Sequence, residues 1–134
     1  MKLKHLATSV ALAFLVVSCY TGPIVVPEGL TPAELIQRGQ EASDKNRYSQ
    51  SLQYYSAVID RFPFDIDSII AAEYEIAFIH YKQKNYDLAK TELNDLIGRY
   101  NVPDGELLPP HFKILSGIVL SKIEEIELSR KKRN

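Results

Sequence analysis

Only a few side chains in this sequence have the chemical types that catalysis or metal binding requires. The chain of 134 residues contains one cysteine, Cys19, and three histidines. His111 follows two prolines and has no carboxylate or cysteine at ligand spacing. Asp60, Asp65 and Asp67 surround a Phe-Pro-Phe segment, but they lack the regular oxygen spacing and the glycine of a calcium loop. N-capping and solvated charge are therefore the favoured interpretation of these three carboxylates.

Larger catalytic signatures are also missing from the sequence. It contains no glycine-rich phosphate loop and no serine, histidine and aspartate set in a recognisable context. The sequence therefore predicts no catalytic site, no metal site and no cofactor, and a protein that is not an enzyme.

The single cysteine closes a short apolar run near the N-terminus. Lys2 and Lys4 give a positive start, and residues 6–17 are almost entirely apolar. This is the order of a secretory signal, with its charged region, apolar region and cleavage region. The run is shorter than the about 20 apolar residues that span a bilayer. The alternative is an N-terminal core helix with a buried thiol, which the lack of a polar face in the run disfavours.

The residues before the cysteine carry a resemblance. Val16-Val17-Ser18-Cys19 resembles a bacterial lipobox, the site where a lipoprotein signal peptidase cuts before a lipid-modified cysteine. The family pattern prefers leucine three residues before the cysteine, where this chain has Val16. The resemblance implies that residues 1–18 are a lipoprotein signal peptide and that Cys19 carries two or three acyl chains, palmitate among them. One acyl chain anchors a protein only reversibly, whereas two or more hold it on the membrane.

The chain that remains after removal of the signal peptide is weakly acidic. Of the 16 basic side chains, Lys2 and Lys4 would leave with the signal, so 14 would remain against 17 acidic ones. This is not the charge balance of a nucleic-acid-binding protein, so we expect no nucleic acid partner. Tyr20 follows the cysteine in place of aspartate, and by the usual sorting rule this favours the periplasmic face of the outer membrane.

The residues after the lipidation site predict a tether. Residues 20–30 hold two prolines and two glycines, so we interpret residues 19–30 as the lipidated cysteine and a flexible tether. Alternatively, Ile24, Val25 and Val26 dock on the domain as an edge.

Residues 31–131 have the pattern of an all-α domain. Thr31-Pro32-Ala33-Glu34 is a helix start, with threonine as the N-cap, proline at the first position and glutamate closing a capping box. Asp67 is the expected N-cap of the third helix. No segment alternates with period two for long enough to predict a strand. The expected helices span residues 32–45, 48–62, 68–83, 86–100 and 110–130, and residues 132–134 form a basic tail. The tail suits a helix C-terminus, and contact with anionic lipid head groups is the alternative to a solvated, frayed end.

Two of the expected helical hairpins match each other. In each, a small residue is followed by a tyrosine just after the turn and then by a second small residue. The first hairpin has Gly39, Tyr48 and Ser51 in these places, and the second has Ala77, Tyr86 and Ala89. We expect the small residues to lie where the paired helices cross, and the tyrosines to fill the gap beside the turn.

This pattern resembles the tetratricopeptide repeat (TPR), whose usual period is about 34 residues. Here the two tyrosines are 38 positions apart. Arg38 and Glu73 depart from the repeat pattern, and His80 stands where the pattern usually has tyrosine, which favours a packed helix-face histidine. The resemblance implies a short α-solenoid of two TPR hairpins. The last helix, long and apolar on one side, is the capping helix that such a stack needs.

In TPR arrays the first helix of each hairpin lines a concave face that takes peptides or partner helices. Carried over by position, the partner-binding groove of this chain would contain Ile36, Gln40, Ser43, Tyr74, Phe78 and Tyr81. The last three lie on one helix face, and aromatic anchors are typical of interface hot spots. The alternative is that the last helix covers them and they belong to the core.

The sequence thus predicts a membrane-anchored lipoprotein that serves as a TPR protein-interaction or scaffold module in the bacterial cell envelope. Its repeats are similar to those of the lipoprotein of the outer-membrane β-barrel assembly machinery and of cell-envelope coordination proteins. The expected partners are other envelope proteins or peptides, and the membrane itself through Cys19. One rival prediction is a small-molecule or lipid-binding accessory protein of an envelope transport system, with the aromatic face as its pocket. The other is an envelope hydrolase, which the missing catalytic set disfavours.

Overall fold

The computed structural model describes residues 23–133, so Cys19 and the predicted signal peptide lie outside the described part. Within that part the chain is all-α, as predicted, and contains no strand. The helices are α1 (Pro32–Asp44), α2 (Tyr48–Arg61), α3 (Ile66–Lys82), α4 (Tyr86–Gly98) and α5 (Pro110–Lys131), with two short 3₁₀ turns, η1 (Arg99–Asn101) and η2 (Gly105–Leu107), between α4 and α5.

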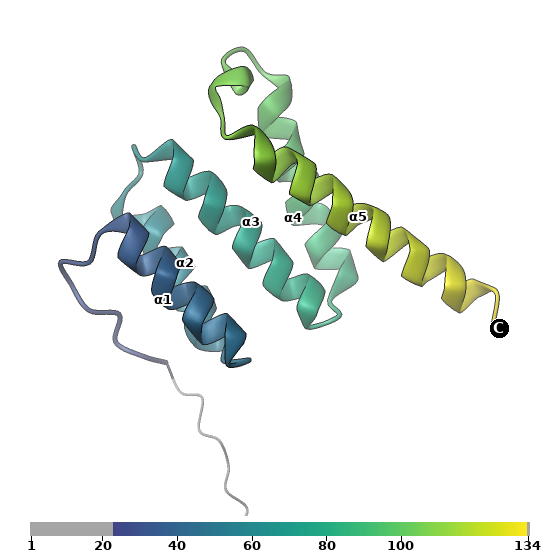
Figure 1. The fold of residues 1–134 in the computed structure, drawn as a ribbon, viewed down its shortest axis with the longest axis horizontal. Coiled ribbons are helices and arrows are strands. Elements are labelled where there is room, and N and C mark those ends of the chain that lie inside the picture. Colours follow the sequence, from purple (N-terminus) through teal and green to yellow (C-terminus); the bar gives the residue numbers. More distant parts are fainter. Residues whose placement is uncertain (1–22, 134) are drawn as a thin grey trace, which may run out of the picture.

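The helices form two antiparallel hairpins and a closing helix (Figure 1). α1 pairs with α2, and α3 pairs with α4. α3 packs against both helices of the first hairpin, and α5 packs against both helices of the second. Figure 1 shows α1, α3 and α5 side by side in one layer, with α2 and α4 behind them. α5 therefore occupies the place that the first helix of a third hairpin would take.

The N-terminus of α1 has the predicted capping box. Thr31 Oγ1 accepts a hydrogen bond from the Glu34 backbone N–H at 3.3 Å, and Glu34 Oε2 accepts one from the Thr31 N–H at 2.8 Å. These bonds to Thr31 lower the pKa of the Glu34 carboxyl, because they stabilise its ionised form. The prediction of Asp67 as the N-cap of α3 is wrong. Asp65 is the cap and accepts from the Ser68 N–H at 3.2 Å, so α3 begins at Ile66.

Both hairpin turns use the same backbone geometry. Asn46 and Lys84 have φ angles of 55° and 63°, in the left-handed region that most side chains avoid. In each turn this residue donates to the carbonyl three positions earlier, and the next residue donates to the carbonyl five positions earlier. The two turns lie 38 positions apart, so the backbone repeats with the period found in the sequence.

The crossing of α1 and α2 depends on a small residue. A Cβ atom added to Gly39 would lie 2.5 Å from Cε1 of the Tyr55 ring, closer than van der Waals contact allows. Ser51 Oγ donates a buried hydrogen bond of 2.6 Å to the Gly39 carbonyl. Tyr55 is fully buried. In the second hairpin Ala77 and Ala89 are both fully buried in one cluster.

The loop between α4 and α5 directs the last helix back onto the stack. α4 ends at Gly98, before the predicted end at Tyr100, and the chain tightens into η1. Gly105 lies against the Tyr100 backbone, where a Cβ atom would approach the Tyr100 carbonyl carbon and oxygen to 2.7 Å. The Tyr100 hydroxyl donates to the Pro109 carbonyl at 2.8 Å, just before α5 begins. From there α5 adds Val119 and Ile123 to the core of the second hairpin.

Candidate interaction surfaces

The predicted groove is divided between core and surface, and Tyr74 belongs to the core. Its side chain is only 8% exposed. The ring stacks on Phe78 with centroids 5.9 Å apart, and it meets the ring of Phe112 from α5 at 5.5 Å. The last helix therefore covers Tyr74, which is the alternative that the sequence left open. Phe78 and Tyr81 are half-buried and continue the stack with centroids 5.7 Å apart.

The α1 side of the predicted groove is partly open. Ile36 is half-buried and packs on the core of the first hairpin. Gln40 and Ser43 lie beside Phe78 in a pocket of about 280 Å³ between α1 and α3. The other residues that line this pocket are Asp44, Glu75 and Lys82. Three of the six predicted groove residues thus share this small pocket with charged neighbours.

Polar contacts across this pocket join the two hairpins. Gln40 Nε2 donates to Glu75 Oε1 at 3.3 Å, and Lys82 Nζ donates to Ser43 Oγ at 2.9 Å. Lys82 Nζ also lies 5.2 Å from the centre of the Tyr48 ring, a cation–π distance. Burial raises the pKa of the Glu75 carboxyl, and the bond from Gln40 and the charge of Lys82 offset part of that rise.

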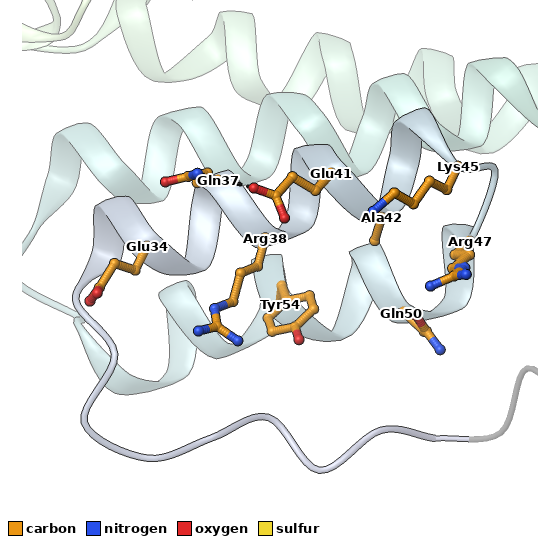
Figure 2. Close-up of a pocket in the computed structure, with 9 residues that line it drawn as sticks. All are labelled: Glu34, Gln37, Arg38, Glu41, Ala42, Lys45, Arg47, Gln50 and Tyr54. Carbon is orange, nitrogen blue, oxygen red and sulfur yellow. Dashed lines mark hydrogen bonds between the residues drawn. The ribbon is translucent and has the colours of Figure 1, made fainter.

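A second, larger pocket was not predicted. It has a volume of about 480 Å³ and lies between α1 and α2, where Figure 2 shows Arg38 and Tyr54 projecting from the two helices. Its lining is polar and consists of Glu34, Gln37, Arg38, Glu41, Ala42, Lys45, Arg47, Gln50 and Tyr54. Spacing along one helix does not reveal it, because its walls come from two helices and the turn between them. The departure from the repeat pattern at Arg38 was the one available sign.

The outer side of α5 carries a strip of exposed aliphatic side chains. Ile114 is 64% exposed, Ile118 47% and Leu115 37%, and Leu107 of η2 is 76% exposed. The three α5 residues lie at positions i, i+1 and i+4, so they share one helix face. We call these three α5 residues the α5 strip. The cap of a solenoid is expected to have a polar outer face, and the first half of α5 does not.

The segment before α1 is docked along α2. The Ile24 N–H donates to Gln53 Oε1 at 2.9 Å, and Arg61 donates to the carbonyls of Val26 and Pro27 at 3.0 and 2.7 Å. Val26 and Leu30 also pack on the core of the first hairpin. Ile24 and Val26 of the alternative edge thus contact the first hairpin, whereas Val25 is 93% exposed.

Two departures from the repeat pattern form contacts between helices. His80 Nδ1 lies 2.7 Å from Glu92 Oε2 of α4, so this histidine links α3 to its partner helix. Glu73 forms an ion pair with Arg99 just after α4. Among residues 23–133 no group of three or more histidine, cysteine or acidic side chains is arranged to hold a metal ion. No helix in the same range is long and apolar enough to cross a membrane.

Comparison with known proteins gives one distant relative. A protein of Treponema pallidum (strain Nichols), described as uncharacterized, is 37% identical over 99 residues, which cover 74% of this chain and 40% of that protein. The chain thus spans less than half the length of the relative it matches. No protein-family model matches the sequence, and no solved structure does.

Proposed function

We propose that this chain is a membrane-anchored lipoprotein of the bacterial cell envelope that binds another protein through its TPR-like helical array. Support for the anchor comes from the lipobox-like Val16-Val17-Ser18-Cys19, which precedes the described residues. Support for protein binding comes from the α5 strip. Large apolar side chains that gather on one exposed helix face, rather than being scattered singly, are typical of an interaction site.

The partner that fits the α5 strip is an amphipathic helix. In this stack α3 packs on the first hairpin and α5 packs on the second, so each layer is covered by the next helix along. A partner helix laid on the strip would continue the same packing by one more layer. Such helix-in-groove recognition uses apolar anchors spaced three, four and seven residues apart.

Site-specific photocross-linking in intact cells tests the protein-binding part. A photoreactive phenylalanine analogue at Ile118 is expected to give a discrete protein adduct, and Ile114→Glu in the same chain is expected to abolish it. Phe64 provides the control position, because it is 94% exposed and apolar but belongs to the loop between the hairpins. The peptide joined to position 118 should carry apolar residues at helical spacing. Equal adducts from positions 64 and 118, or an adduct that Ile114→Glu leaves intact, would refute the proposal.

Metabolic labelling tests the anchor separately. Cells that make the parent chain and are fed labelled palmitate should yield a labelled protein, and the Cys19→Ser variant should yield none. Labelling of both chains, or of neither, would exclude acylation at Cys19.

The aromatic face does not support the alternative of a small-molecule or lipid-binding accessory protein. That hypothesis required Tyr74, Phe78 and Tyr81 to line an apolar pocket. Tyr74 is buried under Phe112 of α5, and the pocket beside Phe78 is lined mainly by polar and charged side chains.

A further inference from the structure

The two ends of the helix stack carry opposite charge. The chain alternates in direction, so one end holds the C-termini of α1, α3 and α5 together with both hairpin turns. We call it the turn end. The terminal helical turns and connecting residues there contain eight basic side chains: Lys45, Arg47, Lys82, Lys84, Arg130, Lys131, Lys132 and Arg133. The same segments contain three acidic ones: Glu41, Asp44 and Asp87.

The opposite end has the reverse balance. Its terminal turns and loops contain eight acidic side chains: Glu28, Glu34, Asp60, Asp65, Asp67, Asp95, Asp104 and Glu106. Three basic side chains lie there, and two are already engaged. Arg61 binds backbone carbonyls of the docked segment, and Arg99 pairs with Glu73. Lys113 is the third and is exposed.

Cation–π contacts hold two of the basic residues of the turn end against tyrosines beside the two turns. Lys82 lies over the Tyr48 ring beside the first turn, and Arg130 lies over the Tyr86 ring beside the second, each at 5.2 Å. Tyr81 and Tyr86 meet at 6.0 Å between them. Of the eight basic side chains, all but Lys82 are exposed, and no acidic side chain among residues 23–133 pairs with any of the eight within 4.0 Å.

Helix dipoles explain only part of this arrangement. Cations stabilise helix C-termini, so Lys82 and Arg130 are favourable where they are. Arg47 and Lys84, however, immediately precede or adjoin the N-termini of α2 and α4, where a positive charge is unfavourable. Both residues also closely follow the C-termini of α1 and α3, so the dipoles of the flanking helices act on them in opposite directions and give no clear net preference for a positive charge.

The path of the chain before α1 points to what the turn end faces. Arg61 at the far end of α2 binds residues 26 and 27, and Gln53 in the middle of α2 binds Ile24. Read back toward the N-terminus, the segment thus runs along α2 toward the turn end. Only three residues lie between Cys19 and Pro23, and the four Cα-to-Cα steps that join them reach at most about 14 Å. An acylated Cys19 would therefore keep the membrane surface close to this part of the domain.

We propose that the turn end is a binding surface for anionic phospholipid head groups. This binding orients the domain with its hairpin turns toward the membrane and its acidic end away from it. The distance argument rests on the proposed lipid anchor, while the charge argument does not. Basic residues near an anionic surface each contribute about 1 kcal/mol, or roughly fivefold in affinity. Acyl chains and a basic patch are also the kind of two-signal anchor that gives stable attachment.

Lysine footprinting on vesicles tests the proposal. The full lipoprotein, purified from membranes, is reconstituted with phosphatidylcholine vesicles that contain or lack phosphatidylglycerol, and then acylated at its exposed lysines. We expect Lys45, Lys84 and Lys132 to be protected several-fold on the anionic vesicles only, and to become reactive again at high ionic strength. Lys113 at the acidic end should react equally on both. Equal protection at the two ends, or protection that does not depend on lipid composition, would overturn the proposal.

Matched charge variants complete the test. Lys45→Gln/Arg47→Gln/Lys84→Gln is expected to remove the composition-dependent protection of Lys132. The control Arg38→Gln/Lys113→Gln/Lys122→Gln deletes the same charge elsewhere and should leave that protection unchanged. If both variants behave like the parent, the basic end does not bind lipid. Flotation with neutral vesicles reports the acyl anchor independently. A chain that floats only with anionic vesicles would support lipid binding by the turn end and refute the acyl anchor at Cys19.

Discussion

The clearest test of the hairpin packing is the substitution Gly39→Ala. The new methyl group would lie 2.5 and 2.7 Å from Cε1 and Cζ of Tyr55. That ring is fully buried with Leu35 and Val58 in the core of the first hairpin, so it has little room to move. Overpacking of this kind costs about 1–3 kcal/mol. Replacing glycine by alanine within a helix contributes about 1 kcal/mol in the opposite direction, so we expect a net loss of up to about 2 kcal/mol.

Gly117 provides the matched control. It also lies inside a helix, α5, but a Cβ atom there would have nothing within 4 Å outside its own helix. Gly117→Ala should therefore gain up to about 1 kcal/mol from helix propensity alone. Both variants replace a helical glycine with alanine. They differ only in whether the added methyl group contacts a neighbouring side chain.

The assay is urea unfolding followed by circular dichroism, on a soluble form that begins at Tyr20. A double-mutant cycle with Tyr55→Leu isolates the contact, because the smaller side chain removes the ring that the methyl group would strike. Gly39→Ala should cost less in that background, with a coupling energy of about 1–3 kcal/mol, because the helix-propensity gain cancels in the cycle and only the overpacking cost remains. If Gly39→Ala stabilised the protein as much as Gly117→Ala, the α1–α2 crossing described here would be incorrect.

Three further predictions follow from single residues. Gly105→Ala should lower the free energy of unfolding by about 1–3 kcal/mol in urea melts, because its Cβ atom would meet the rigid backbone of Tyr100 at 2.7 Å; an unchanged melt would contradict the loop packing. Burial raises the pKa of Glu75 above 4.5 in the folded state, so its contribution to stability is complete below the unfolded pKa and is lost as the pH rises through the folded pKa. Glu75→Gln should therefore melt at a higher temperature than the parent at pH 7, with the difference shrinking toward pH 4, and a pH-independent difference would count against this reasoning. Lys84 has a φ angle of 63°, so Lys84→Gly should stabilise the second turn by about 1 kcal/mol, whereas Lys84→Ala, which keeps the strained Cβ, should not.

Local sequence signals predicted the positions of the helices well. They failed at the start of α3, where two residues qualify as the N-cap. The threonine and proline at residues 31 and 32 leave one position for the start of α1, and the structure has it there. At α3 the acidic residues Asp65 and Asp67 both qualify as N-caps by type. The choice depends on where the loop after Pro63 ends. The Asp65 N–H donates a hydrogen bond to the Phe62 carbonyl at 3.0 Å, so the loop ends in a turn at Asp65. That turn is set by backbone geometry, which residue type alone does not reveal.

The candidate site was harder to predict because it depends on which helix covers which face. Tyr74, Phe78 and Tyr81 share one helix face by spacing, and the sequence does not say what lies over it. The packing of α5 against the second hairpin determines which of these residues are covered. It places Phe112 on Tyr74 and leaves the pocket beside Phe78 open. Likewise, the polar pocket between α1 and α2 and the basic turn end each draw residues from separate segments. Their members become neighbours only when the hairpins stack.

The two proposed surfaces lie on different sides of the stack and are compatible with each other. The α5 strip ends at Ile118, and the basic residues of α5 begin at Arg130, twelve positions later, which is about 18 Å of helix. The strip belongs to the outer side of the last layer, whereas the basic residues belong to the ends of the helices. A domain seated on a membrane by its turn end would therefore still present Ile114 and Ile118 sideways to a partner. Neutralising the turn end should then change the orientation of the domain without removing the adduct from position 118, and Ile114→Glu should do the reverse. If each variant abolished both readouts, the two surfaces would be one site.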